Sequence, residues 1–195
     1  MSAFLGPIHF WLYNKIRFQE DLIDALCVRA VSEGWLTEED TQQFVSTDRR
    51  ELQDAIDESN IHGWLQGRIH DGEGRYAALV TTLLQEDTNR LQTLKDVAFY
   101  TGKEKRTEVP TTAPEAFHQL DNTLLNGMPC DQVMKVTESN PDKVVWEETQ
   151  DLHSSFWNGQ GAYYYTLRAE LIKGILADSG LTFKQTDTNR YEIIK

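Results

Sequence analysis

Residues 8–20 read IHFWLYNKIRFQE, and residues 61–73 read IHGWLQGRIHDGE. Both segments share the isoleucine, histidine, tryptophan, leucine, basic residue, isoleucine and glutamate at a constant offset of 53 positions, and Ala25-Leu26 and Ala78-Leu79 extend the match. Two tryptophans and two histidines among the matched positions are hard to obtain by chance. Further on, Glu39-Asp40-Thr41 resembles Glu86-Asp87-Thr88 at an offset of 47. We interpret these matches as a tandem duplication of a helical unit of about 50 residues.

The spacing of apolar residues within each copy predicts a long helix. Isoleucine or leucine recurs every four residues, at Ile8, Leu12 and Ile16 in the first copy and at Ile61, Leu65 and Ile69 in the second. Residues four apart lie on one face of an α-helix, so these side chains should pack into the core. We expect one helix from residue 8 to about residue 32, entered through Pro7, and another from residue 61 to about residue 84.

The remaining patterns divide the chain into three parts. Residues 1–106 are expected to form the duplicated helical bundle, with copies at about 8–57 and 61–105, and residues 107–128 a linker and a short helix. In residues 129–195, two pairs of β-rich segments flank turn residues, and a helical pattern over about 162–178 separates the pairs. This order predicts a hairpin, a helix and a second hairpin with an antiparallel sheet. The expected fold class is α+β, mainly helical.

The duplication also places a histidine and a glutamate at equivalent positions of both long helices. His9 precedes Glu20 by 11 residues, as His62 precedes Glu73, so each pair lies near one helix face but about 16 Å apart along the axis. One metal ion cannot bind both members of a pair on the same helix. Antiparallel helices would bring His9 to Glu73 and His62 to Glu20. Parallel helices would bring the two histidines together at one level and the two glutamates together at another.

Two interpretations of these residues are open. Each could form a satisfied hydrogen bond or ion pair, or together they could form a site between the helices for a divalent transition metal or a small molecule, with His70 as a further ligand. The second copy carries glycines at positions 63, 67, 72 and 74. Glycines weaken a helix, so they favour either close approach by another helix or a flat ligand, or a break in the helix near His70.

Aromatic residues and a cysteine add further candidates. Trp11 and Trp64 lie in the repeat, and Trp157 and Tyr164 lie in and just after a glycine-containing loop over residues 152–161 that could line a ligand pocket. Cys130 follows a predicted helix and precedes a predicted strand, where a nucleophile could be presented. With His153 as its base it would form a cysteine-dependent hydrolase. The alternative is a turn cysteine without a catalytic role.

Composition limits the partners and the compartment. The formal net charge of −12 repels phosphate backbones and anionic membrane surfaces, and no cluster of basic residues with interleaved aromatics reverses it locally, so neither nucleic acid nor membrane is an expected partner. The apolar runs are far shorter than the ~20 residues of a membrane-spanning helix. Two cysteines without a paired spacing fit a reducing cytoplasm.

Three functional hypotheses follow from these patterns. The first is a soluble protein that binds a metal ion or small molecule at a site bounded by His9, Glu20, His62 and Glu73. The second is the hydrolase that uses Cys130 and His153. The third is a non-catalytic interaction protein whose exposed aromatic residues form a homodimer interface.

Overall fold

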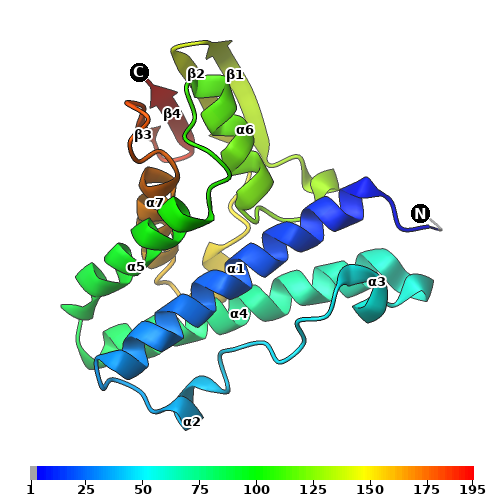
Figure 1. Ribbon diagram of the computed structural model, residues 1–195, viewed down its shortest axis with the longest axis vertical. Helices are drawn as coiled ribbons and strands as arrows, with labels where there is room; N and C mark the ends of the chain where they lie inside the picture. Colours follow the sequence, from blue (N-terminus) through cyan, green and yellow to red (C-terminus); the bar gives the residue numbers. More distant parts are fainter. Residues whose placement is uncertain (1–3) are drawn as a thin grey trace.

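Residues 4–195 are described by a computed structural model (Figure 1). Its helices and strands are, in chain order, α1 (Pro7–Ser32), α2 (Glu38–Thr41), α3 (Leu52–Ala55), α4 (Ile61–Glu86), α5 (Arg90–Lys105), α6 (Ala113–Thr123), β1 (Met134–Asn140), β2 (Lys143–Glu148), α7 (Ala162–Ile175), β3 (Thr182–Asp187) and β4 (Arg190–Ile194). Single 3-10 turns lie at η1 (Glu58–Asn60), η2 (Pro129–Asp131) and η3 (Ser154–Phe156). Helices, the 3-10 turns included, make up 57% of residues 4–195, so the fold is α+β and mainly helical, as predicted. Within residues 4–195, no helix is long and apolar enough to cross a membrane.

The two copies of the repeat form parallel helices. The rings of His9 and His62 lie 5.7 Å apart, and those of Tyr13 and Trp64 lie 5.9 Å apart, so the first turns of α1 and α4 are at the same end. Figure 1 shows the two helices side by side along their length. The apolar ridges are buried as predicted with one exception: Ile8, in the first turn of α1, is 49% exposed. Its expected place in the core was wrong.

Helix α4 is continuous from Ile61 to Glu86, so the predicted break near His70 is wrong. Its glycines do not mark the close approach of another element either. A Cβ atom at Gly67 or Gly74 would have no atom within 4 Å outside the local helix backbone, and one at Gly72 would make only ordinary contacts at 3.7 Å with Gln19 and Glu20. The cost of these three glycines in the helix is therefore not explained by a tight packing contact, whereas a Cβ atom at Gly63 would lie 2.3 Å from the side chain of Asn60, which caps the helix.

The two copies diverge after their long helices. The first continues into the short helices α2 and α3, whereas the second continues into the 16-residue helix α5. The Glu-Asp-Thr sequence that recurs at an offset of 47 also lies in different secondary structure in each copy, because Glu39 lies inside α2 while Glu86 is the last residue of α4. The structural likeness between the copies therefore lies in α1 and α4.

The four strands form one antiparallel sheet in the order β1-β2-β4-β3, built from the two predicted hairpins. Trp146 on β2 stacks on Tyr191 of β4 at 5.6 Å between ring centroids, and Phe117 of α6 packs against Trp146 at 5.1 Å. A single hydrophobic cluster runs from Leu26 of α1 through α4 and α7 to the sheet. Whether the three predicted parts of the chain behave as separate units stays a prediction.

Close approach by glycine occurs elsewhere, where α5 packs against α7. A Cβ atom added at Gly102 of α5 would lie 2.2 Å from the carbonyl oxygen of Leu171, and one added at Gly174 of α7 would lie 1.9 Å from that of Phe99. Both distances are far shorter than a van der Waals contact, and the atoms concerned belong to the backbone, which cannot rotate away as a side chain can. The two glycines therefore allow the backbones of α5 and α7 to touch, which sets where α7 stands relative to the sheet.

This contact gives a matched pair of substitutions. Gly174→Ala should destabilise the protein by about 3 kcal/mol, because the added methyl group forces the α5 and α7 backbones apart. Gly67→Ala adds the same methyl group to an open helix position and should stabilise by about 0.5 to 1 kcal/mol. Urea unfolding followed by circular dichroism would measure both. Equal stability of the Gly174→Ala protein and the wild type would contradict the close packing.

Candidate functional site

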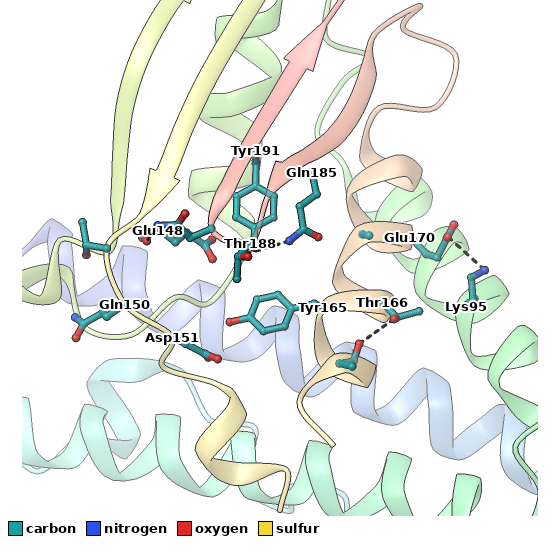
Figure 2. A pocket seen from close by; sticks show the side chains of 14 residues that line it. Lys95, Glu148, Gln150, Asp151, Tyr165, Thr166, Glu170, Gln185, Thr188 and Tyr191 are labelled. Carbon is teal, nitrogen blue, oxygen red and sulfur yellow. Dashed lines mark hydrogen bonds and ion pairs between the residues drawn. The ribbon is translucent and has the colours of Figure 1, made fainter. Parts of the chain in front are cut away.

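A cleft of about 850 Å³ opens between α7 and the sheet (Figure 2). We refer to it as the α7 cleft. Tyr165 and Thr166 reach it from α7, Gln185 and Tyr191 from β3 and β4, and the segment that follows β2 contributes Asp151. The full lining consists of Lys95, Glu148, Thr149, Gln150, Asp151, Ala162, Tyr165, Thr166, Ala169, Glu170, Gln185, Thr188, Asn189 and Tyr191.

Two of the three carboxylates in the α7 cleft are already paired with cations. Glu148 is buried and forms an ion pair with the buried guanidinium of Arg168, whose Nη1 donates to Glu148 Oε2 at 3.1 Å. Glu170 has the ammonium groups of Lys173 at 2.9 Å and Lys95 at 3.6 Å. The negative charge of these two carboxylates is therefore matched within the protein.

Asp151, by contrast, has no ion-pair partner among residues 4–195. Its Oδ1 accepts hydrogen bonds from the backbone N–H groups of His153 at 2.9 Å and Ser154 at 3.0 Å. Partial burial acts to raise the pKa of this carboxyl, but hydrogen bonds from Ser154, Tyr165 and the His153 backbone outweigh it and hold the pKa at about 2. Asp151 is therefore ionised at every physiological pH and contributes a negative charge without an ion-pair partner among residues 4–195.

The hydroxyl of Tyr165 points toward Asp151 (Figure 2). Burial and the negative charge of Asp151 both raise the pKa of this hydroxyl, so it stays protonated and acts as a donor to the carboxylate. Burial and the nearby Glu148 likewise raise the pKa of Tyr191 to about 12. The α7 cleft thus presents two neutral phenols beside one fixed anion.

Several of the predicted site residues meet in a buried polar cluster behind the α7 cleft. His153 Nδ1 lies 3.1 Å from Glu73 Oε1 on α4, and the Tyr164 hydroxyl lies 3.0 Å from His153 Nε2. The exposed fractions of Glu73, His153 and Tyr164 are 2%, 2% and 5%. Because a carboxylate can only accept, Nδ1 donates its proton to Glu73 Oε1, while Nε2 lies within hydrogen-bond distance of the Tyr164 hydroxyl. Asn126 links this cluster to Glu148, with Oδ1 3.1 Å from His153 Nε2.

Cys130 is not part of this cluster. It is exposed in η2, and neither ring nitrogen of His153 has it as a hydrogen-bond partner in the described chain. The imidazole is instead engaged by Glu73, Asn126 and Tyr164. A cysteine-dependent hydrolase that uses Cys130 and His153 stays a prediction for which this arrangement offers no direct contact.

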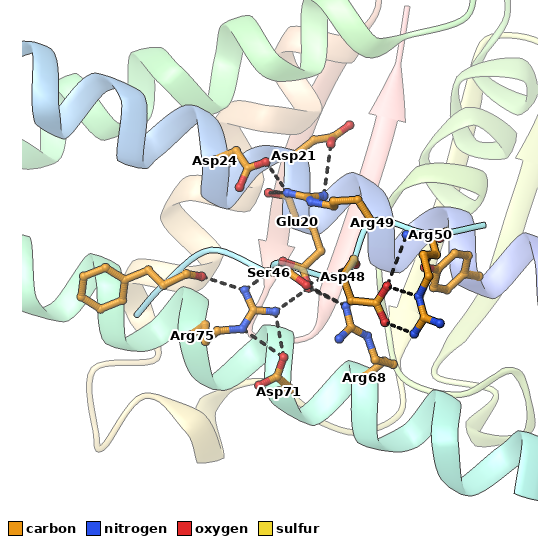
Figure 3. A network of polar contacts seen from close by, with 12 residues as sticks. Glu20, Asp21, Asp24, Ser46, Asp48, Arg49, Arg50, Arg68, Asp71 and Arg75 are labelled. Atoms are coloured by element: carbon orange, nitrogen blue, oxygen red, sulfur yellow. Dashed lines mark hydrogen bonds and ion pairs between the residues drawn. The ribbon is translucent and has the colours of Figure 1, made fainter. Parts of the chain in front are cut away.

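Glu20 has a different environment from its repeat counterpart Glu73. It is 2% exposed and faces Arg75 of α4, whose Nη1 donates to Glu20 Oε2 at 2.9 Å (Figure 3). Arg75 also donates to the carbonyl oxygen of Phe44 at 2.7 Å, and a second guanidinium, that of Arg68, lies 3.6 Å from Glu20. Burial acts to lower the pKa of Arg75, but hydrogen bonds to Glu20 and Asp71 outweigh it and raise the pKa. Two arginines therefore occupy the space that a metal ion would need.

The predicted metal ligands consequently do not converge. Parallel packing brings the rings of His9 and His62 together, but His9 Nδ1 already accepts from the Gly6 N–H at 2.9 Å. His70 contacts Gln66 at 2.7 Å and the ring of Phe156. Across residues 4–195, no group of three or more His, Cys, Asp or Glu side chains is arranged to bind a metal ion.

The four predicted aromatic residues also lie apart. Trp11 Nε1 donates to Asn122 of α6 at 2.8 Å, and Trp64 packs on Tyr13. Only Trp157 and Tyr164 are neighbours, with ring centroids 6.1 Å apart in the buried core. Whether these residues bind a ligand stays a prediction.

The loop over residues 152–161, which was expected to line a pocket, contributes Leu152, His153 and Phe156 to a small cavity of about 70 Å³. The larger α7 cleft is lined instead by the four residues before this loop, Glu148 to Asp151, and by none of the four aromatic residues predicted to bind a ligand. Gln185 and Tyr191 belong to strands far along the chain, and no local pattern marks them. The signal that could have been used is Asp151 directly before the loop, since an aspartate there caps the turn and carries a charge.

The buried cluster around His153 gives two substitutions that should change the free energy of unfolding by very different amounts. His153→Ala should lower the free energy of unfolding by about 3 to 5 kcal/mol, because it leaves the buried Glu73 carboxylate without its partner. Glu73→Gln should change it by about 1 kcal/mol or less, since the amide oxygen can still accept from Nδ1 and Oε2 has no partner to lose. Urea denaturation at neutral pH measures both. Equal losses in the two variants would mean that the charge of Glu73 is itself required.

No family model, no curated protein and no solved structure matches this chain in the three comparisons made. Its function is therefore inferred from the chemistry of its own residues.

Proposed function

We propose that this protein binds a small organic cation in the α7 cleft, with the positive group of the ligand against Asp151. The observation that carries the proposal is the Asp151 carboxylate, which is ionised, borders an 850 Å³ cleft and has no ion-pair partner in the described chain. A binding protein for a small molecule is one of the functions that the sequence predicts. The site differs from the expected one, because it lies at α7 and not between α1 and α4.

The size of the α7 cleft suits a small molecule. Ligand sites usually have volumes of about 300–1,000 Å³ and combine apolar surface with a few placed polar groups. Here Tyr165 and Tyr191 provide aromatic surface, and Gln150, Gln185 and Thr188 provide neutral hydrogen-bonding groups. The guanidinium of Arg168 already lies 5.8 Å from the centroid of the Tyr165 ring and 5.3 Å from that of the Tyr191 ring, so a ligand cation would gain aromatic attraction only at ring surface that Arg168 leaves open.

The charge of the α7 cleft selects the sign of the ligand. Glu148 is paired with Arg168, and Glu170 with Lys95 and Lys173, so Asp151 is the one carboxylate of the lining without an ion pair among residues 4–195. Each of these three cations already has a carboxylate partner, so an anionic ligand would meet Asp151 without an unpaired cation from the described lining beside it. The net charge of −12 acts in the same direction over longer distances, since it attracts cations toward the surface.

Asp151 can serve this role because its geometry is fixed. Its Oδ1 is bonded to the backbone of the turn that begins η3, and the Tyr165 hydroxyl holds the carboxylate from α7. A carboxylate that is already oriented loses little conformational freedom when a ligand binds. This is the arrangement expected for a recognition group.

The proposal predicts a selectivity that a matched ligand series measures. Phenethylammonium, 2-phenylethanol and 3-phenylpropanoate have similar sizes and carry positive, zero and negative charge. Isothermal titration calorimetry should give the highest affinity for the cation and the lowest for the anion. Asp151→Asn keeps an acceptor for the turn but removes the charge, so it should weaken binding of the cation about tenfold and leave binding of the alcohol unchanged.

Asp142→Asn is the control for this experiment. Asp142 lies in the β1–β2 turn, its side chain is 72% exposed, and it does not line the α7 cleft. This variant should bind phenethylammonium as the wild type does. Equal affinity for cation and anion, or full affinity in a folded Asp151→Asn protein, would refute the proposal.

The low pKa of Asp151 gives a prediction for pH. A folded-state pKa of about 2 lies below the ordinary value for aspartate, so the carboxylate keeps its charge as the pH falls from neutrality and loses it only near pH 2. The affinity for phenethylammonium should therefore be constant between about pH 7 and about pH 4. A loss of half the affinity by about pH 4 would indicate an ordinary aspartate and would contradict the assigned hydrogen bonds.

A further inference from the structure

A second site is built around Lys15, which plays no part in the α7 cleft. Lys15 is only 3% exposed, although lysine is rarely buried. Its Nζ lies 3.7 Å from Asp121 Oδ1 on α6 and 3.9 Å from the centroid of the Trp11 ring. In the repeat, its counterpart is Arg68, whose guanidinium is directed toward Glu20. The duplication has thus left an amine where the other copy has a group that cannot act as a nucleophile.

Lys15 borders a cavity of about 230 Å³ between the first turns of α1, the C-terminal part of α6 and the segment over residues 126–134. We refer to it as the Lys15 cavity. Ile8, Trp11 and Met128 give it apolar walls, and Asn126 and Gln132 add neutral amides. A cavity of about 150 Å³ accommodates benzene, so this one has room for a small ring with a short substituent. The unexpected exposure of Ile8 is explained in part by its position at this cavity.

The surroundings of Lys15 favour the neutral amine. Burial lowers the pKa of Lys15 to about 8, although Asp121 acts to raise it. About a tenth of the side chains are then neutral at pH 7, compared with well under a thousandth for an ordinary lysine. Asp121 is the charged group that faces the amine, so it controls this balance.

We propose that Lys15 is a nucleophile that forms an imine with a small, uncharged aldehyde or ketone bound in the Lys15 cavity. The proposal rests on the buried amine, the adjacent carboxylate and the cavity that both of them line. It does not depend on the cation site in the α7 cleft.

The chemistry is balanced without an oxidant or a reductant. The lone pair of Nζ attacks the carbonyl carbon, a C–N bond forms, and the π electrons of the carbonyl move to its oxygen. Asp121 moves one proton from nitrogen to that oxygen, which gives a carbinolamine. It then delivers to the same oxygen the proton that the ammonium form of Lys15 had released, so the oxygen leaves as water when the C=N bond forms. Overall, the ammonium form of Lys15 and one carbonyl compound give one protonated imine and one water, and the positive charge stays beside Asp121.

The lining also restricts the class of carbonyl compound. Among residues 4–195, Lys15 is the only cation that lines the cavity, and imine formation leaves its charge paired with Asp121. A carboxylate on the ligand would have no cation to meet and would be repelled by Asp121. Uncharged carbonyl compounds are therefore expected to react in preference to keto acids.

Reductive trapping tests the proposal directly. The full chain is incubated with benzaldehyde and sodium cyanoborohydride at about pH 7.5, and peptide mass spectrometry locates the benzyl group. Lys15 should be labelled at least about tenfold faster than the exposed Lys184, because far more of it is neutral at this pH. An ordinary α-amino group has a pKa of about 7.7–8.0, so the N-terminal amine is also expected to react. It therefore serves as an internal control.

A larger aldehyde separates the cavity from simple amine reactivity. Pyrene-1-carboxaldehyde is too large for 230 Å³, so it should label the N-terminal amine and spare Lys15. Lys15→Arg keeps the charge near Asp121 and should lose the benzyl label at this position with an unchanged circular dichroism spectrum. Asp121→Asn should shift the pH of half-maximal Lys15 labelling downward, since Asp121 raises the pKa of the amine. Labelling of Lys15 no faster than Lys184, or equal labelling by both aldehydes, would overturn the proposal.

Discussion

The packing of α1 against α4 depends on the buried pair between Glu20 and Arg75. A buried carboxylate without a partner costs several kcal/mol, so the helices can adopt only a register in which Arg75 reaches Glu20. The apolar ridges supply most of the stabilisation, because hydrophobic burial is the dominant favourable term in folding. The ridges alone would tolerate a slip of one turn, since their pattern repeats every four residues. The ion pair therefore fixes the register of α1 against α4 more than it stabilises the fold. This register decides which residues of the two helices lie beside each other.

That register determines where the two candidate sites form. With α1 and α4 parallel and in register, the N-terminal half of α1 lies beside α6, and Lys15 is buried between Trp11 and Asp121. The opposite side of the molecule is set by the contact of α5 with α7, where Gly102 and Gly174 let two backbones touch. This contact positions α7 so that Tyr165 stands opposite the ends of β3 and β4. The two sites are thus consequences of different helix contacts and can be altered independently.

The repeat also shows how a duplicated sequence acquires unequal environments. Glu20 and Glu73 are equivalent in sequence and equally buried, yet one faces arginines and the other faces His153. Two ionised carboxylates placed against each other would repel, so the parallel arrangement that brings the histidines together cannot bring the glutamates together as well. The basic residue that the two copies share differs in the same way, because Arg68 forms an ion pair with Glu20 whereas Lys15 borders a cavity. The symmetry of the repeat is therefore present in the helices and absent from their polar partners.

From the sequence alone, the periodicity of apolar residues and the turn clusters determined the long helices, both hairpins and the mainly helical α+β class, because these features depend on neighbours within a few residues. The repeat indicated that Glu20, Glu73 and the two histidines have structural or binding roles, and His153 was identified as a candidate catalytic base. Only the tertiary structure decided that the long helices are parallel, that Arg75 forms an ion pair with Glu20 and that Asp151 has no cation partner among residues 4–195. These outcomes depend on contacts between residues that are tens of positions apart, and no local pattern encodes which distant side chain a buried charge will meet.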